Sequence, residues 1–192
     1  MYLGMNKKRI YLYPTDTLYG LGVDATDPEA INVLRALKGE GREGKHFSIT
    51  VSDLAMLDEY AYVTPLAEKL IEKFLPGKIT IVLKPRNLPS ELGVGTDEVG
   101  VRIPNNQLAL NLIEKIGKPI TATSANVSGM PTKDTPAEIL EQFGNNAHLI
   151  TDVIDGGQLV ASDPSTVVDA RDEEPIIIRE GAIPTHDILS VL

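Results

Sequence analysis

A helix-capping side chain precedes proline at Asp27-Pro28, Thr64-Pro65 and Thr135-Pro136. The Asp and Thr side chains can accept hydrogen bonds from the first backbone N–H groups of a helix, and proline is favoured at the first helical position. Glu138 completes a capping box with Thr135. These signals predict that a helix begins at each of the three sites. Helix starts at three defined places limit the folds that the chain can adopt.

Short apolar runs that favour β-structure alternate with these helix starts, and several of them stop at a proline, which cannot continue a strand ladder. Helices and strands interleave without the regular spacing of a doubly wound fold. The pattern predicts one mixed α+β domain over residues 1–192, with a twisted sheet flanked by helices. We predict helices at 27–38, 52–60, 64–74 and 107–116, and a further helix that begins at residue 135. We predict strands at 10–13, 47–51, 79–83, 99–103, 148–150, 165–168 and 176–178, and a further strand that begins at residue 120.

Composition excludes several classes of function. The chain has no cysteine, which rules out disulfides, thiolate metal sites and cysteine nucleophiles, and its three histidines lack the spacing of a zinc site. A net charge of −9 disfavours broad nucleic-acid binding but leaves room for a local basic cleft. Because no apolar run is long enough for a signal peptide or a membrane span, we expect a cytoplasmic protein with no membrane partner.

The segment Ile120–Gly129 (ITATSANVSG) combines a β-favouring start with hydroxyl and amide side chains and a turn-forming end. Such a segment can end a buried strand and then present backbone N–H groups and hydroxyls to an anionic ligand. A loop of this composition can equally serve to cap a helix. Both interpretations remain open at the level of composition.

A Gly-rich loop at residues 39–46 nearly matches the phosphate-binding P-loop pattern. His46 stands where that pattern needs Ser or Thr, and the loop leads into a predicted strand rather than a helix, so we do not expect a P-loop. Lys38, Arg42 and Lys45 can still bind phosphate, because glycines let the backbone approach a ligand closely. The alternative is a solvated charged loop.

Arginines and hydroxyls lie at the ends of several predicted strands. Arg102 precedes a strand-ending proline, Ser165 begins a strand, and Arg179 ends another. An Arg at such a position is either an edge residue with its head in solvent or a clamp for a carboxylate. Together these residues predict one cleft for an anionic ligand.

Six motifs in this order resemble the YrdC/Sua5 family, the threonylcarbamoyl-AMP synthases. The resemblance covers residues 10–181 and implies a short form, with a YrdC-like α/β twisted open sheet and a large concave basic cleft. The six motifs are Pro14-Thr-Asp-Thr-Leu-Tyr-Gly-Leu-Gly22, Leu75-Pro-Gly-Lys-Ile-Thr80, Val101-Arg-Ile-Pro104, Thr123-Ser-Ala-Asn-Val-Ser-Gly129, Ser165-Thr-Val-Val-Asp169 and Ile178-Arg-Glu-Gly181.

The resemblance also implies a reaction, in which L-threonine, bicarbonate and ATP, with Mg²⁺, give threonylcarbamoyl-AMP and pyrophosphate. The product would supply the transferase machinery that makes t6A at adenosine 37 of ANN-decoding tRNAs. The resemblance assigns threonine binding to Thr17, Arg102, Ser124 and Ser165, nucleotide binding to Lys38, Arg42, Lys45, Ala122, Asn126, Thr132 and Arg179, catalytic roles to Lys38 and Arg42, and no protein ligand to a metal.

The chain departs from the family at the loop after Lys38. The family usually reads Lys-x-Arg-Pro, whereas this chain reads Lys38-Gly-Glu-Gly-Arg42, with one extra residue and no proline. Two other functions stay open. One is an RNA-binding module that uses the same cleft for tRNA, although aromatic residues for base stacking are scarce. The other is a paralogue that adenylates a different carbamoyl donor.

Overall fold

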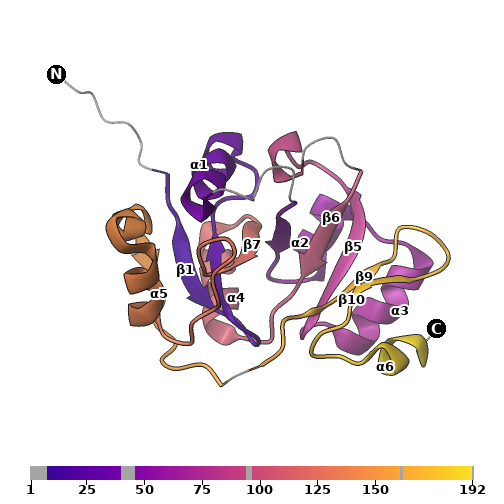
Figure 1. Ribbon diagram of the computed structural model, residues 1–192. Helices are drawn as coiled ribbons and strands as arrows, with labels where there is room; N and C mark the ends of the chain where they lie inside the picture. Colours follow the sequence, from indigo (N-terminus) through magenta and orange to yellow (C-terminus); the bar gives the residue numbers. More distant parts are fainter. Residues whose placement is uncertain (1–7, 40–45, 94–96, 161, 192) are drawn as a thin grey trace.

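The described part of the chain, residues 8–39, 46–93, 97–160 and 162–191 of the computed structural model, is built of helices packed on one mixed sheet (Figure 1). Its strands are β1 (Tyr11–Pro14), β2 (Tyr19–Gly22), β3 (Ser48–Thr50), β4 (Ala61–Tyr62), β5 (Ile79–Pro85), β6 (Val99–Arg102), β7 (Ile120–Ser124), β8 (Asp152–Val153), β9 (Thr166–Asp169) and β10 (Ile176–Arg179). Its helices are α1 (Pro28–Lys38), α2 (Leu54–Tyr60), α3 (Pro65–Phe74), α4 (Gln107–Ile116), α5 (Pro136–Phe143) and α6 (Thr185–Leu189), with 3₁₀ turns η1 (Ser90–Leu92) and η2 (Gly144–Leu149).

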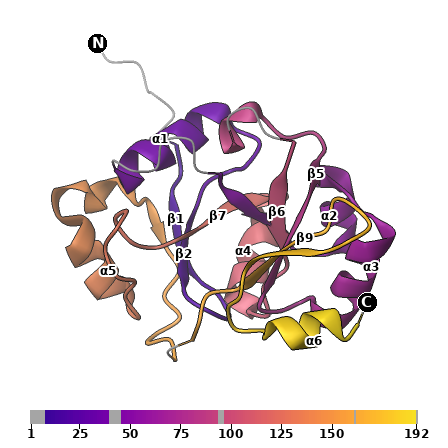
Figure 2. The ribbon, with the colours of Figure 1, turned by 45° about the vertical axis from the view of Figure 1, so that its right-hand side comes forward.

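The strand order is β10-β9-β5-β6-β3-β7-β2-β1-β8, and β4 pairs with β5 outside this path. Three pairs are parallel (β1 with β8, β3 with β6 and β5 with β9), and the others are antiparallel. Figures 1 and 2 show α5 at the β1 end of the sheet and α3 and α6 at the opposite end, beside β9. The mixed pairing confirms the predicted α+β class and excludes a doubly wound sheet.

The three predicted helix starts are confirmed by their hydrogen bonds. The Asp27 carboxylate accepts from two backbone N–H groups of α1, and the Thr64 hydroxyl accepts from one N–H of α3, that of Ala67. At α5 the Thr135 hydroxyl accepts from the N–H of Glu138 and donates to the Glu138 carboxylate. Because caps act within a few residues, they could be predicted without the tertiary fold.

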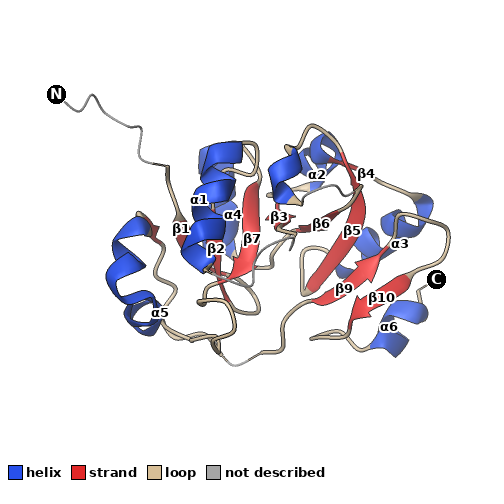
Figure 3. Ribbon diagram, turned by 45° about the horizontal axis from the view of Figure 1, so that its top comes forward, coloured by secondary structure: helices blue, strands red, loops and turns tan. Residues whose placement is uncertain are grey.

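Two buried clusters cover opposite faces of β1, as helices on both sides of the sheet require (Figure 3). Leu12 points into the main cluster, which includes Leu34 of α1, whereas Tyr11 and Tyr13 pack with Ile113 of α4. Alternate residues of a strand face opposite sides, so this run of apolar residues reflects burial on both faces. A strand buried in this way holds the loop that follows it in a defined place.

Strand β2 was not predicted, because its Gly-Leu-Gly sequence is typical of a turn. Both glycines are needed for close packing instead. A Cβ at Gly22 would lie 2.7 Å from the carbonyl oxygen of Thr121, and one at Gly20 would lie 3.0 Å from the Tyr13 ring. The hydroxyl of Tyr13 donates to that same Thr121 carbonyl at 3.3 Å. The tertiary packing of β1, β2 and β7 therefore overrides the turn propensity.

Other local predictions need correction. Residues 148–150 do not form a strand, because η2 continues from α5 to Leu149 and the short β8 pairs with β1 only at residues 152–153. Asp53, not Ser52, caps α2, since its carboxylate accepts from the N–H of Met56. Strand β4, turn η1 and helix α6 were also not predicted. Within the described ranges, the helices are all too short or too polar to cross a bilayer.

Candidate functional site

Strand register brings polar residues from distant parts of the sequence side by side. Thr50 of β3 is the register partner of Arg102 at the end of β6. Across β5, β9 and β10, Val167 is the partner of both Thr80 and Arg179. Residues that face one another across a ladder share a face of the sheet. The register alone therefore gathers two arginines and two threonines toward one region.

These residues line a cavity of about 330 Å³. Its wall is rich in hydroxyl groups, contains two arginines and includes no Asp or Glu among the described residues. A cavity with this lining suits a polar anionic ligand. The lining residues are Tyr13, Thr15, Thr17, Leu18, Tyr19, Gly20, His46, Ser48, Thr50, Thr80, Arg102, Ala122, Thr123, Ser124, Thr132, Pro164, Ser165, Val167 and Arg179.

Arg102 is held by the loop between β1 and β2. Its Nη2 lies 2.5 Å from Oδ1 of Asp16, and its Nη1 lies 3.4 Å from Oγ1 of Thr17. The side chains of Arg102 and Asp16 are 9% and 8% exposed, so this ion pair is buried. A buried guanidinium that keeps donors facing a cavity can bind a carboxylate through two parallel hydrogen bonds.

Arg179 lines the same cavity and is hydrogen-bonded to Ser165, the residue before β9. Its Nη2 and Nε donate to the carbonyl oxygen of Ser165 at 2.7 and 3.2 Å. The hydroxyls of Ser165 and Thr80 lie 2.8 Å apart. Burial, and then the positive charge of Arg102, lower the pKa of Arg179. The two guanidinium groups therefore repel one another, and an anion between them would relieve the repulsion.

Lys38, the last residue of α1, contacts the loop after β7 rather than the cavity. Its Nζ donates to the carbonyl oxygen of Ser124 at 2.6 Å and to the carbonyl and amide oxygens of Asn126. The Ser124 hydroxyl also donates to Oδ1 of Asn126 at 2.6 Å. Lys38 and Asn126 thus fix the end of β7, where Thr123 and Ser124 line the cavity.

Most of the predicted site residues that the structure describes share this cavity. The threonine-binding set Thr17, Arg102, Ser124 and Ser165 lines it, together with Ala122, Thr132 and Arg179 from the predicted nucleotide set. Lys38 and Asn126 lie behind this wall, while Arg42 and Lys45 fall outside the described residues.

Sequence reasoning missed Thr80, Tyr13 and Asp16. Thr80 and Tyr13 line the cavity, and Asp16 pairs with an arginine that does. Thr80 and Asp16 lie within two of the six family motifs, and these positions could have identified them as site residues. Strand alternation around the buried Leu12 was the signal for Tyr13.

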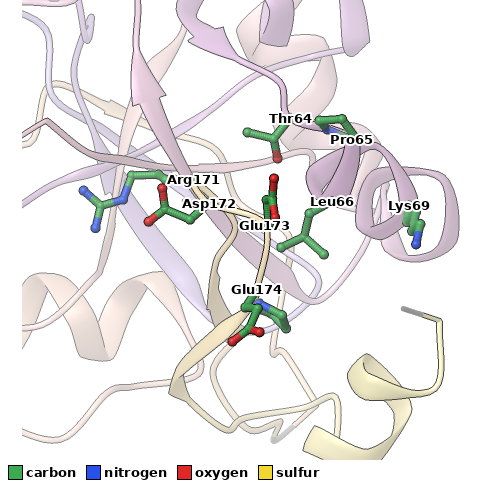
Figure 4. Close-up of a pocket in the computed structure, with 9 residues that line it drawn as sticks. Thr64, Pro65, Leu66, Lys69, Arg171, Asp172, Glu173 and Glu174 are labelled. Carbon is green, nitrogen blue, oxygen red and sulfur yellow. The ribbon is translucent and has the colours of Figure 1, made fainter.

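A second, wider hollow of about 930 Å³ lies between the start of α3 and the turn before β10 (Figure 4). Its lining contains three carboxylates, at Asp172, Glu173 and Glu174, against the cations Lys69 and Arg171. Arg171 is already paired with Asp169 at 2.6 Å. The excess of negative charge suits an anionic substrate poorly. We therefore take the arginine-lined cavity as the candidate site.

A family model named for Sua5, YciO and YrdC and described as telomere recombination matches residues 5–181. The chain belongs to the Sua5/YciO/YrdC family. A protein of Methanocaldococcus jannaschii named putative threonylcarbamoyl-AMP synthase is 38% identical over 181 residues, which cover 94% of this chain and 83% of that protein.

Solved structures of the Sua5/YciO/YrdC family share the fold. Sua5 of Pyrococcus abyssi complexed with L-threonine has a TM-score of 0.88 at 34% identity, covering 96% of this chain and 54% of that one. Escherichia coli YciO has a TM-score of 0.79 at 30% identity, covering 91% of this chain and 84% of that one. The family resemblance and the fold are thereby confirmed. The chain spans about half the length of the P. abyssi protein.

Proposed function

We propose that this chain is a threonylcarbamoyl-AMP synthase that makes L-threonylcarbamoyl-AMP and pyrophosphate from L-threonine, bicarbonate and ATP. The observation that carries the proposal is the pair of arginines, Arg102 and Arg179, in one hydroxyl-rich cavity. The relatives named for this activity, and the P. abyssi structure with L-threonine, support it. We further propose that residues 1–192 act as one domain.

Arg102 would bind the threonine carboxylate. Its guanidinium faces the cavity beside the hydroxyl of Thr17, which offers a partner for a polar group of the substrate. Ser124 and Ser165 would complete the threonine site, since both line the same cavity. A planar fork of donors fits a carboxylate better than a single ammonium does.

The nucleotide would lie toward Arg179, with Ala122 and Thr132 against it. Asn126 and Lys38 would support this part through the loop after β7, and a direct contact of Lys38 with phosphate would need its present hydrogen bonds to rearrange. The proposed phosphate contacts of Arg42 and Lys45 rest on their positive charge alone, in the part of the chain outside the described residues.

The proposed chemistry depends on positioning and charge neutralisation. The threonine nitrogen bonds to the carbon of bicarbonate with loss of water, and a carbamate oxygen then attacks the α-phosphorus of ATP. The bond from that phosphorus to the bridging oxygen breaks, and pyrophosphate leaves. Guanidinium groups and oriented donors can stabilise the negative charge that accumulates on the phosphate oxygens.

Mg²⁺ would enter with ATP, and it neutralises charge on the leaving pyrophosphate when bound. Within the described ranges we find no group of three or more His, Cys, Asp or Glu residues placed to hold a metal ion. Phosphate oxygens and water are common ligands of Mg²⁺, which usually keeps several waters. The nucleotide would therefore supply most of the coordination.

The product would pass to the transferase machinery for t6A37 in ANN-decoding tRNA, in the cytoplasm. Direct tRNA binding, and adenylation of another carbamoyl donor, are the competing proposals. The cavity volume of about 330 Å³ suits small substrates better than an RNA strand, and the chain has few aromatic residues for base stacking.

Product analysis tests the proposal. The pure protein is incubated with ATP, Mg²⁺, L-threonine and bicarbonate, and threonylcarbamoyl-AMP is measured by mass spectrometry alongside pyrophosphate release. We expect both products to require threonine and bicarbonate, as omission controls and replacement of L-threonine by L-serine will show. If the protein binds ATP but forms no threonylcarbamoyl-AMP, the proposal is wrong and adenylation of a different carbamoyl donor is favoured.

A further inference from the structure

The buried carboxylate of Asp16 lies behind Arg102 as seen from the cavity. Arg102 and Thr17 line the cavity, whereas Asp16 does not, although it sits 2.5 Å from the Arg102 guanidinium. Both side chains of the pair are more than nine-tenths buried. Moving two charges out of water is costly, and such a pair often stabilises a fold no better than apolar residues would. This placement calls for an explanation beyond stability.

The hydrogen-bond donors of Arg102 are unevenly used. A guanidinium has five N–H donors. Asp16 takes one from Nη2, and Thr17 takes one from Nη1 at the long distance of 3.4 Å. Nε is buried and has no hydrogen-bond partner among the described residues. The donors left for a ligand in the cavity are therefore on Nη1 and Nη2, which form one edge of the fork.

The contact between Asp16 and Arg102 is also incomplete. Only Oδ1 of Asp16 is bonded, and Oδ2 is buried without a partner among the described residues. A side-on pair would bring Oδ2 to Nε and satisfy both atoms, but it would turn the guanidinium. The observed single contact instead leaves further N–H donors on Nη1 and Nη2, and Arg102 is one of the residues that line the cavity.

We infer that Asp16 is a positioning residue that holds Arg102 with its Nη1–Nη2 edge presented to the carboxylate of the amino-acid substrate. The inference rests on the proposed function, because it takes threonine as the ligand of Arg102. Asp16 acts through Arg102 and does not touch the substrate. It also offsets one of the two positive charges in the cavity, so that Arg102 stays at the carboxylate rather than turning toward phosphate.

The first test is the binding of L-threonine to the full chain, measured by calorimetry. Asp16→Asn keeps the shape of the side chain and removes its charge, and we expect it to raise the threonine Kd about tenfold, because a charge-assisted hydrogen bond is roughly twice as strong as a neutral one. The KM for ATP and the kcat at saturating threonine should each stay within about twofold of wild type. Asp24→Asn, which alters a surface pair with Lys118, is the matched control and should leave threonine binding unchanged.

A second variant keeps the inference testable if Asp16→Asn fails to fold. Asp16→Glu retains the charge on a longer arm and displaces the guanidinium, so threonine Kd should rise at least about threefold, since small misplacements of a binding group are expensive. A folded Asp16→Asn or Asp16→Glu protein that binds threonine like wild type would overturn the inference.

A double-mutant cycle separates action through Arg102 from a direct contact. In an Arg102→Lys background, Asp16→Asn should change threonine Kd by less than about twofold, because the fork that Asp16 orients is gone. A tenfold loss in that background would contradict the inference. If wild type itself binds no threonine and makes no adduct, the proposed function fails as well, whereas wild-type activity with an indifferent Asp16 overturns this inference alone.

Discussion

The ammonium of Lys38 lies 2.6 Å from the carbonyl oxygen of Ser124, a residue 86 positions further along the chain. The same ammonium donates to the carbonyl and side-chain oxygens of Asn126. An ammonium has three donors, and these three oxygens match them. The end of α1 is thus tied to the loop after β7, and that loop supplies part of the cavity wall.

Lys38→Met is expected to lower stability as well as activity. The change keeps much of the apolar stem but leaves three partly buried oxygens without their charged donor, which costs about 2–4 kcal/mol. Urea unfolding measures this cost, and Glu72→Gln on the exposed surface of α3 serves as the control. If Lys38→Met loses turnover with an unchanged free energy of unfolding, Lys38 acts on substrate rather than on the loop.

Arg102→Ala should weaken threonine use by about 2–4 kcal/mol in kcat/KM, because a buried charge-assisted pair with the substrate is lost. Arg102→Ala also leaves the buried carboxylate of Asp16 without its ion-pair partner, which can destabilise the fold. Arg102→Lys is therefore the better variant for comparison, because it keeps the positive charge and removes only the planar guanidinium. Steady-state kinetics with varied threonine provide the measurement. A normal KM for threonine in Arg102→Lys would show that another group binds the carboxylate.

Asp169 should contribute to stability in a pH-dependent way. Hydrogen bonds from Arg171 hold the pKa of Asp169 below its ordinary value of 3.8. Because the folded pKa is the lower one, this stabilisation is complete above about pH 5 and fades as pH falls below about 4 through the folded pKa. Asp169→Asn should therefore destabilise the protein most near neutral pH and least in acid.

The free energy of unfolding, measured with denaturant from pH 3 to 7, tests this prediction. This range of about four pH units covers the upper part of the titration of a carboxyl group. Arg171→Gln should flatten the same part of the stability curve, although Arg171 also contacts Glu98 at 3.1 Å. A stability difference between wild type and Asp169→Asn that stays constant with pH would show that the ion pair is not its cause.

Gly22→Ala should destabilise more than Gly20→Ala, although both glycines lie in β2. A Cβ at Gly22 meets the backbone oxygen of Thr121 at 2.7 Å, whereas one at Gly20 meets the side chain of Tyr13 at 3.0 Å. A backbone atom in a sheet yields less readily than a ring, and overpacking of this kind costs about 1–3 kcal/mol. Thermal unfolding of the two variants checks the order, and equal losses would contradict it.

Local chemistry made much of the fold predictable. The caps at Asp27, Thr64 and Thr135 depend on residues within one turn of the helix, and they ended up where the sequence placed them. Strand β2 was missed because its state depends on pairing with β7, far along the chain, whereas residues 148–150 were wrongly assigned because the 3₁₀ segment after α5 continues to Leu149. The Gly-rich β2 is a strand owing to β1 and β7, while residues 148–149 complete a turn after α5.

The candidate site shows the same division. Motif order identified residues such as Arg102, Ser124 and Arg179 as a set, and the family assignment followed from it. Motifs do not specify which side chains support the set, so the contacts of Asp16 and Lys38 were visible only in three dimensions.

The sequence by itself determined the starts of three helices, the class of fold, the family and several of the residues around the cavity. The tertiary structure decided how those residues work together: Thr80 beside Ser165, Asp16 behind Arg102, and Lys38 against the loop after β7. The physical reason is range. Capping and strand propensity act over a few residues, whereas register and burial join groups that lie 85 to 88 positions apart in these contacts.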